Sequence, residues 1–190
     1  VLVSYIEGDG YSFNRSSGIN QVRRFAVNVY DIENSTYAIA NVSFFVTNDS
    51  SNYRFDLKNT SDSLGNASYY FNPDCSYTVG QQYWIAGTTD SCYQDLNTSS
   101  NYTINIISDL SLFITSPNGE KYLIGENNTL LRGNIVDTEC GLNITNAIVN
   151  LTAIQSGIER LCSSTNNEGD GWYNCTITNT THATWTPSTY

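Results

Sequence analysis

Asparagine side chains that can accept a carbohydrate are the most frequent chemical feature of this sequence. Thirteen of its 24 asparagines open an N-x-Ser/Thr sequon without proline, whereas random placement of the 43 Ser and Thr residues gives about 5. The sequon asparagines are Asn14, Asn34, Asn41, Asn48, Asn59, Asn66, Asn97, Asn101, Asn127, Asn143, Asn150, Asn174 and Asn179. Such sites are glycosylated at the surface of secreted proteins. We therefore expect most of them to carry N-glycans, and we expect Asn41, Asn150 and Asn174 to project outward from strands.

Five cysteines offer a second kind of covalent chemistry. Cys75 and Cys92 flank one predicted strand, and a disulfide between them would contribute about 3 kcal/mol. Cys162 and Cys175 lie on the two arms of a predicted hairpin and are the favoured second pair, although Cys140 could pair with either arm. The fifth thiol is expected to be buried or paired with another chain. Disulfides indicate an oxidising, extracytoplasmic compartment.

Side chains that catalyse reactions or bind metals occur here without a recognisable pattern. His182 is the only histidine and lies in a polar run, and the sequence has no G-x-S-x-G, H-E-x-x-H or P-loop motif. Asn166, Glu168 and Asp170 alternate and could offer oxygens to calcium. The distal Glu of an EF-hand loop is missing, however, so a hairpin turn is favoured. We expect no catalytic residue, metal or cofactor, and we do not expect an enzyme.

Three tryptophans, Trp84, Trp172 and Trp185, stand beside 14 tyrosines. They could form a platform on which sugars stack. Aromatic residues at alternating strand positions more often pack in a core or across strands.

The charge balance limits the possible partners. The chain has 8 basic and 18 acidic residues, which argues against nucleic acid and anionic membranes as partners. Only 14% of the residues are charged, so a glycan coat would serve as the solubilising layer. No apolar run approaches the roughly 20 residues of a membrane helix, so no membrane span is expected. The apolar run at residues 1–6 is too short for a signal peptide core, and we expect Val1 to be a processed start.

Predicted strands position these side chains. In the segment 22–30, Phe25, Val27 and Val29 alternate with residues of the opposite face. The other strands predicted in the first part of the chain are 1–6, 38–47, 53–57, 67–71, 77–86 and 101–107, with a polar loop from residue 7 to residue 20. No segment combines helical periodicity with helix caps. Residues 1–108 are therefore predicted to form a β-sandwich.

A second β-sandwich is predicted for residues 109–190. It begins with a hairpin around the Pro-Asn-Gly turn at 117–119, followed by strands at 130–137 and 147–154. Segments 157–163 and 171–178 are predicted to form a hairpin around N-N-E-G-D-G. The sequence thus predicts an all-β chain of two tandem domains.

Several segments carry a more specific likeness. G-N-I-V-D at 133–137, N-A-I-V-N-L-T-A at 146–153 and G-D-G-W-Y-N-C-T at 169–176 resemble the immunoglobulin-like repeats of secreted archaeal surface glycoproteins. The segments V-G-Q-Q-Y-W-I-A-G-T-T-D-S-C-Y at 79–93 and S-P-N-G-E-K-Y at 116–122 are similar to the same class. The resemblance implies immunoglobulin-like sandwiches, N-glycosylation and a structural role at the cell surface. It implies no catalytic residues.

The pattern of this repeat class leads us to expect one more strand after the last predicted strand of the second domain. The N-terminal run could supply it to the next subunit, which would give a head-to-tail polymer of identical subunits. The strand residues would be Val1, Leu2, Val3, Ser4, Tyr5 and Ile6. Two alternatives are that the chain is one unit of a tandem repeat and that this run is simply the first strand of its own domain.

Three functions follow from these patterns. The first is a structural subunit of an extracellular, heavily N-glycosylated filament or surface lattice. The second is a cell-surface adhesin or carbohydrate-binding module. The third, an accessory domain of a secreted hydrolase, has the least support because no paired carboxylates or nucleophile can be recognised.

Overall fold

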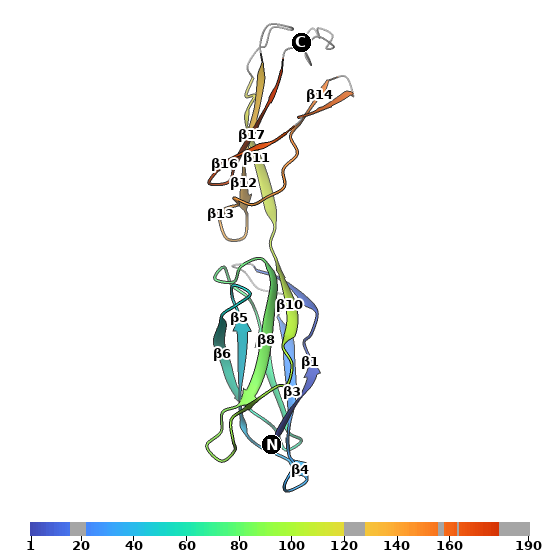
Figure 1. Cartoon of the computed structure of the whole chain (residues 1–190), viewed down its shortest axis with the longest axis vertical. Helices are drawn as coiled ribbons and strands as arrows, with labels where there is room; N and C mark the ends of the chain where they lie inside the picture. Colours follow the sequence, from blue (N-terminus) through green and yellow to red (C-terminus); the bar gives the residue numbers. More distant parts are fainter. Residues whose placement is uncertain (16–21, 120–127, 156–157, 163, 179–190) are drawn as a thin grey trace. The chain divides into compact units, whose positions relative to one another are not determined.

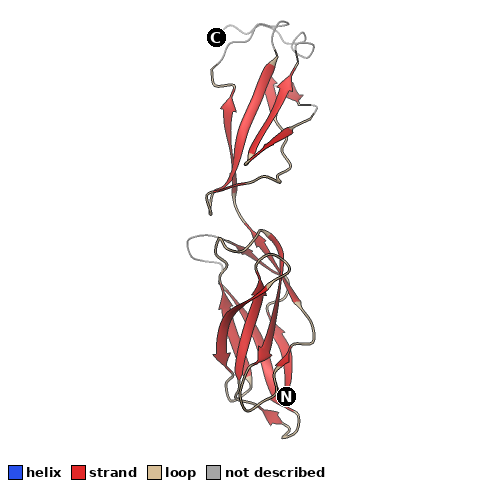
Figure 2. Ribbon diagram, turned by 60° about the vertical axis from the view of Figure 1, so that its left-hand side comes forward, coloured by secondary structure: helices blue, strands red, loops and turns tan. Residues whose placement is uncertain are grey.

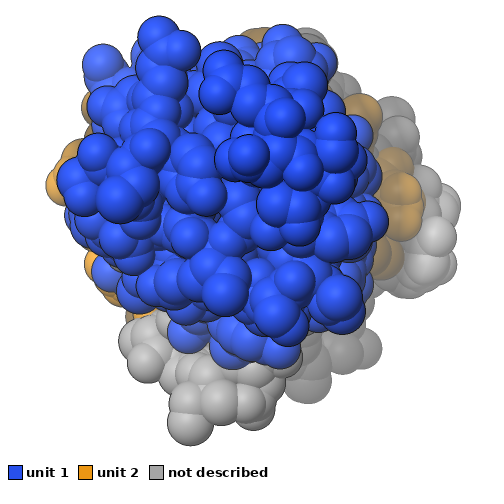
Figure 3. Space-filling view, turned by 90° about the horizontal axis from the view of Figure 1, so that it is seen from below, with its two compact units in different colours: residues 1–108 blue, residues 109–190 orange. Residues whose placement is uncertain are grey.

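A computed structural model describes residues 1–15, 22–119, 128–155, 158–162 and 164–178 of the chain. Every regular element in these residues is a β-strand, so the predicted all-β class is confirmed (Figures 1 and 2). The chain divides into two compact units, unit 1 (Val1–Ser108) and unit 2 (Asp109–Tyr190), which Figure 3 distinguishes by colour. Each unit is described by itself.

Unit 1 consists of two sheets. The first contains β1 (Leu2–Glu7), β3 (Arg23–Asp31), β4 (Thr36–Tyr37) and β7 (Asn66–Phe71). The second has the order β2 (Tyr11–Asn14), β10 (Tyr102–Ile107), β8 (Gly80–Thr88), β5 (Asn41–Thr47) and β6 (Tyr53–Thr60), with β9 (Leu96–Asn97) paired to β8. Figure 1 shows β6, β5, β8 and β10 side by side.

The core of unit 1 is built from side chains that alternate along its strands. The predicted core face of β3 is fully buried at Phe25, Val27 and Val29, each with 0% exposure. Trp84 of β8 also has 0% exposure, and its indole stacks on the Phe25 ring with centroids 4.6 Å apart. Its Nε1 donates a hydrogen bond of 3.0 Å to the Gly8 carbonyl, so the buried polar atom of the indole has a partner.

The structure corrects the prediction of a loop over residues 7–20 at one point. Residues Tyr11–Asn14 form β2, which runs parallel to β10, with Tyr11 opposite Ile104 and Phe13 opposite Ile106. Phe13 is fully buried. Four residues between Gly10 and Arg15 give a weak strand signal, and the partner strand lies far along the sequence. The pairing therefore depends on contacts that a local pattern does not contain.

The N-terminal run is also placed differently from its predicted role between subunits. Residues Leu2–Glu7 form β1, which pairs antiparallel with β3 of the same unit, with Val3 opposite Val29. Val3 is 4% exposed and belongs to the core. The run follows the alternative in which it is the first strand of its own domain, because it pairs with the edge of β3 and places Val3 in the core.

The topology of unit 1 is immunoglobulin-like. The first part of the chain divides between the two sheets as β1 and β2. The sheet of β1, β3 and β7 faces that of β10, β8 and β5, as strands A, B and E face G, F and C in an immunoglobulin domain.

Unit 2 also consists of two sheets. The larger has the order β11 (Leu110–Ser116), β12 (Thr129–Asp137), β17 (Trp172–Ile177) and β16 (Asn166–Gly169), with β13 (Leu142–Asn143) paired to β12. The smaller contains β14 (Thr152–Gln155) and β15 (Ile158–Leu161). Its apolar core contains Leu131, Leu151, Cys162, Cys175 and Ile177.

The predicted hairpin of unit 2 pairs other strands than expected. The segment 157–163 was matched with 171–178, but β15 pairs with β14 and β17 pairs with β16. Asp170 and Gly171 have positive φ values of 49° and 76°, as a two-residue hairpin turn with the twist of the strands requires. The turn is therefore only Asp-Gly, and Asn166–Gly169 is a strand. The return strand of the hairpin predicted around the Pro-Asn-Gly turn, at 120–126, lies outside the described residues. The turn itself, at 117–119, lies within them.

The two units repeat the same corner. The Val29 amide donates to the Gly65 carbonyl at 2.8 Å, and the Ile135 amide donates to the Gly171 carbonyl at 2.9 Å. Both glycines have positive φ, and a side chain at either would meet the carbonyl oxygen of Val29 or Ile135. By this equivalence, β3 of unit 1 corresponds to β12 of unit 2, and β7 corresponds to β17. Since β1 pairs with β3 and β11 pairs with β12, β1 corresponds to β11.

Candidate interaction surfaces

Aromatic side chains form two rows across the outer face of the larger sheet in unit 1. In the first row, Phe45 lies opposite both Phe55 of β6 and Ile85 of β8. In the second, Tyr53 lies opposite Thr47, and the Thr47 hydroxyl accepts a hydrogen bond of 2.8 Å from the Tyr83 amide. We call Phe45, Tyr53, Phe55, Tyr83 and Ile85 the aromatic face. It is uncharged and lies on three neighbouring strands.

The aromatic face is packed within itself and open to solvent. The rings of Phe45 and Phe55 meet edge to face, with centroids 5.8 Å apart. Phe55 is 59% exposed and Tyr53 is 38% exposed, while Phe45, Tyr83 and Ile85 are half-buried. Burial, together with the nearby Tyr83, raises the pKa of Tyr53, so its hydroxyl stays neutral at physiological pH. The five side chains of the aromatic face therefore offer an uncharged contact area, and Lys58 lies in the neighbouring row, opposite Ser43.

The sequence had suggested a different set of aromatic residues for sugar stacking. Trp84 is buried and cannot contact a ligand. Trp172 is half-buried, with the guanidinium carbon of Arg132 4.0 Å from its ring centre. Trp185 lies outside the described residues. The bulge between Phe44 and Phe45 in the pairing of β5 with β6 brings Phe55 opposite Phe45, and no local pattern in the sequence contains that register.

Eleven of the sequon asparagines lie in the described residues, and each is either exposed or intermediate in exposure. Asn127 and Asn179 lie outside that part. Asn150 is exposed, whereas Asn41 and Asn174 are intermediate. Asn150 precedes β14, so it does not lie on a strand as predicted. Whether these sites carry glycans remains a prediction.

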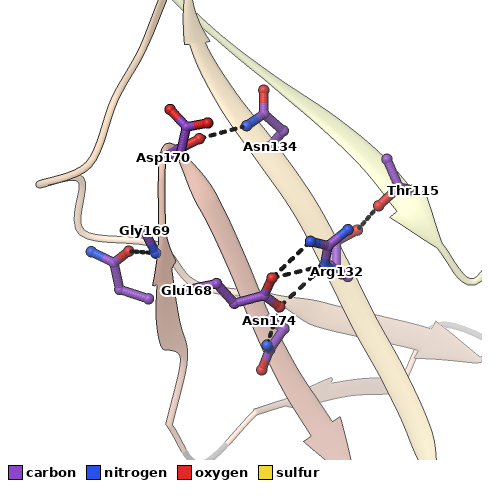
Figure 4. A network of polar contacts seen from close by, with 8 residues as sticks. Thr115, Arg132, Asn134, Glu168, Gly169, Asp170 and Asn174 are labelled. Atoms are coloured by element: carbon purple, nitrogen blue, oxygen red, sulfur yellow. Dashed lines mark hydrogen bonds and ion pairs between the residues drawn. The ribbon is translucent and has the colours of Figure 1, made fainter.

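Some sequon amide groups are already held by neighbours. The Asn34 Nδ2 donates to Asp31 at 2.7 Å, and the Asn41 Nδ2 donates to Asp90 at 2.9 Å. The Asn174 Nδ2 donates to Glu168 Oε1 (Figure 4). A glycan is attached to this nitrogen and replaces one of its two hydrogens, so at these three sites it would be attached to a nitrogen that already donates to a carboxylate. Asn97, by comparison, is exposed on the short edge strand β9.

Figure 4 shows the polar network of unit 2 that contains Asn174. Arg132 donates from Nε and Nη2 to Glu168, the shortest of the three contacts being 2.7 Å. The Arg132 guanidinium lowers the pKa of Glu168, and the carboxylate in turn raises the pKa of Arg132. With Trp172 beneath it, Arg132 ties β12 to β16 and β17.

The N-N-E-G-D-G segment is accounted for by this network and the turn. Glu168 is paired with Arg132, and the Asp170 carboxylate accepts from Asn143 at 3.2 Å. No group of His, Cys, Asp or Glu suited to a metal ion occurs in the described residues.

The disulfides agree with one predicted pair and contradict the other. Cys162 and Cys175 are bonded, with Cα atoms 6.2 Å apart. Cys75 is also disulfide-bonded, but not to Cys92, whose thiol is free and exposed. Cys75 precedes the nine-residue strand β8 and Cys92 follows it, so the strand separates them by roughly 30 Å, far beyond the reach of a disulfide. Cys140, expected to hold the leftover thiol, is disulfide-bonded as well.

A third surface lies on unit 2, where the side of β11 that faces the core is uncovered. Leu112 lies opposite Ile135, so it occupies the place that Val3 has opposite Val29 in unit 1. Val3 is 4% exposed, whereas Leu112 is 43% exposed. Leu110 and Ile114 on the same side are 56% and 55% exposed. We call Leu110, Leu112 and Ile114 the open strip.

The open strip has a simple origin. In unit 1, β8 and β10 form the part of the second sheet that lies across the core from β1 and β3. In the described residues of unit 2, the second sheet contains only β14 and β15. Counterparts of β8 and β10 are missing from this part of the chain, so the core side of β11 faces solvent.

The described part of the chain also holds no helix with the length and apolar character of a membrane span.

Comparisons with known proteins find distant structural likenesses only. No family model and no curated protein matches the sequence. Three solved structures that resemble the chain are invasin, a bacterial integrin-binding protein (14% identity, 95% of this chain and 34% of that chain, TM-score 0.43), fibronectin(III)-like modules of Clostridium thermocellum CbhA (13%, 93% and 78%, 0.34) and a tetra-tandem repeat from the extending region of a large adhesion protein (14%, 90% and 40%, 0.43). The chain thus spans 34% of the invasin structure. These likenesses concern chain architecture and do not extend to function.

Proposed function

We propose that the chain is a structural module of an extracellular, N-glycosylated surface polymer in which unit 2 is completed by strands of a second copy. The observation that carries the proposal is the open strip. Unit 1 buries the equivalent side of β1 under a full second sheet, whereas unit 2 leaves three aliphatic side chains of β11 in solvent. Natural β-proteins avoid such surfaces unless a partner covers them.

The occupant that best fits this surface is a β-strand. The second sheet of unit 2 has only two strands among the described residues, so an incoming strand can pair beside β14 and cover the open strip from the core side. A strand from another copy makes a contact between different surfaces of the two molecules. Contacts of this kind build open filaments or lattices when the rotation between successive copies does not close into a ring.

The extracellular setting and the glycans belong to the same proposal. The Cys162–Cys175 disulfide fits an oxidising compartment. The sequons in the described residues are all at least partly accessible. The donor is a strand other than β1, because Val3 belongs to the core of its own unit.

The test is the association of the purified chain, followed by sedimentation and negative-stain imaging. Leu112→Asp should abolish polymers, because it places a charge where the incoming strand packs. Phe113→Asp is the matched control, since Phe113 is 56% exposed on the opposite side of β11 and should leave assembly intact. A chain that stays monomeric at all concentrations, or equal behaviour of the two variants, contradicts the proposal.

A second candidate function is a glycan-binding adhesin, and the aromatic face is the observation that favours it. Binding of free glycans to the chain, lost in Phe55→Thr and kept in Tyr70→Thr, would support this candidate. Tyr70 is 63% exposed on β7 in the other sheet.

A further inference from the structure

The aromatic face lies next to sequon asparagines on the same side of its sheet. Asn41, Ser43 and Phe45 alternate along β5 with the buried Val42 and Phe44, so they share the outer face. On β8, Gly87 and Ile85 share that face, and Gly87 lies opposite Asn97 of β9. Asn97 therefore stands one residue row, about 7 Å, from Ile85.

Gly87 shows how closely Asn97 lies over the sheet. A Cβ at Gly87 would collide with the Asn97 Oδ1 and approach the Leu96 carbonyl to 2.9 Å. The Asn97 side chain thus occupies the space above Gly87 that a side chain of β8 would fill. Its amide group begins at the edge of the aromatic face, and Asn97 is exposed.

We propose that the aromatic face is the seat of the chain's own N-glycan, attached at Asn97. The inference rests on the glycosylation in the proposed function and names where one glycan lies. A sugar bonded to the Asn97 Nδ2 starts beside Ile85, and the sugars that follow it reach Phe45 and Phe55.

The chemistry of the face suits this occupant. Pyranose rings have one side made of C–H groups, whose slight positive charge is attracted to the negative face of an aromatic ring. The face contains uncharged rings on three neighbouring strands, with hydroxyls at Tyr53 and Tyr83. A tethered glycan meets this surface at high effective concentration, so weak stacking suffices to hold it.

The experiment measures how far the aromatic rings of the face are shielded from radicals in the solvent. Hydroxyl-radical labelling read by mass spectrometry is applied to the secreted, glycosylated chain and to Ser99→Ala. This variant removes the sequon hydroxyl, leaves Asn97 in place and alters an exposed residue. Labelling of Phe55 and Tyr83 should rise about threefold in Ser99→Ala, as a stacking contact near 0.7 kcal/mol predicts.

Internal controls make the result specific. Labelling of Tyr70 on the other sheet should be equal in the two proteins. Thr60 and Ser61 lie in the Asn59 sequon, and Ser61→Ala is unsuitable as a control because Ser61 is buried and hydrogen-bonded to the Ala38 carbonyl. Ser68→Ala removes the Asn66 sequon on the other sheet and should leave Phe55 and Tyr83 protected.

The outcomes separate this inference from the proposed function. Equal labelling of Phe55 in the two proteins, with Asn97 shown to be glycosylated, overturns the inference alone. A bare Asn97 with glycans at other sequons does the same. A bare chain at every sequon overturns both the inference and the glycoprotein part of the proposed function. Protection of Phe55 that persists in Ser99→Ala assigns the face to a free glycan or a protein partner, and it also overturns the inference.

Discussion

Unit 1 and unit 2 repeat the same corner but differ in what lies across the core from their first strands. Val3 and Leu112 occupy equivalent places opposite Val29 and Ile135. Val3 is buried under the sheet that contains β8 and β10, whereas Leu112 faces solvent. The difference shows that burial of a strand depends on the opposing sheet as much as on the strand's own sequence.

The largest effect is expected from Trp84, because unit 1 depends on the sheet that unit 2 lacks among its described residues. Trp84→Ala should cost about 3–5 kcal/mol, a large share of the 5–15 kcal/mol of a typical domain. Trp172→Ala in unit 2 should have a much smaller effect, since that ring is half-buried. Urea unfolding followed by hydrogen exchange of each unit measures the difference. Similar losses in the two variants would contradict the comparison.

The disulfide of unit 2 should be the next most important contribution. Cys162 and Cys175 are 13 residues apart, and closing a loop of this size contributes about 3 kcal/mol. Cys162→Ala combined with Cys175→Ala should therefore unfold unit 2 at a clearly lower urea concentration and leave unit 1 unchanged. Hydrogen exchange resolves the two units. If β12 and β17 exchange as slowly as in the parent chain, the small core of unit 2 is sufficient without the disulfide.

The equivalent residues Val3 and Leu112 allow the most direct comparison. Val3→Ala removes two buried methyl groups and should cost about 2 kcal/mol. Leu112→Ala should change the stability of the dilute monomer by less than about 0.5 kcal/mol, because Leu112 is exposed there. Thermal unfolding at low protein concentration tests both. A larger loss in Leu112→Ala would mean that the open strip is covered in solution.

Lowering the pH should reduce the stability of the chain less than these substitutions do, mainly through carboxylates in the turns of unit 1. The pKa values of Asp31, Asp49, Asp62, Asp74 and Asp90 are lowered, in each case by hydrogen bonds from neighbouring side chains or amides. Their contribution is fully present above the unfolded value of about 3.9 and is lost as the pH falls through the lower folded values. The urea midpoint should therefore be flat from neutral pH to about 5 and decline below about 4.

A single substitution tests whether the acid sensitivity comes from one of these carboxylates, that of Asp62. The Asp62 carboxylate accepts from the amides of Leu64 and Asn66. Asp62→Asn keeps the shape of the side chain but removes its charge, so the decline at low pH should become shallower. An unchanged pH profile would assign the acid sensitivity to other carboxylates.

The fold class was predictable because the alternation of Phe25, Val27 and Val29 is a local signal that burial confirms. The pairing of Cys162 with Cys175 was favoured for a similar reason, although the arms proved to belong to different hairpins. The Cys75–Cys92 pairing was wrong because proximity in sequence was taken for proximity in space across an extended strand.

The candidate surfaces were not predictable from local patterns. The aromatic face depends on the register of β5 with β6 and β8, including the bulge that sets Phe55 opposite Phe45. The open strip depends on which strands the opposing sheet contains in the described part of unit 2. The repeat of the corner did leave a signal in the sequence: D-x-E segments at 31–33 and 137–139 begin two residues after the equivalent Val29 and Ile135.

The parallel pairing of β2 with β10 gives unit 1 a particular response to tension. β2 lies near the start of the unit and β10 at its end, joined in register from Tyr11 opposite Ile104 to Asn14 opposite Ile107. A pull that drags the two strands in opposite directions along their length loads all of these hydrogen bonds together, in shear, and cannot open them one at a time. Two further bonds, from the Gly10 amide to Thr103 and from the Arg15 amide to Ile107, lie at the two ends of the pair and share the load. Unit 1 should therefore resist a force that pulls β2 and β10 apart along their length more strongly than a force that separates the two strands sideways.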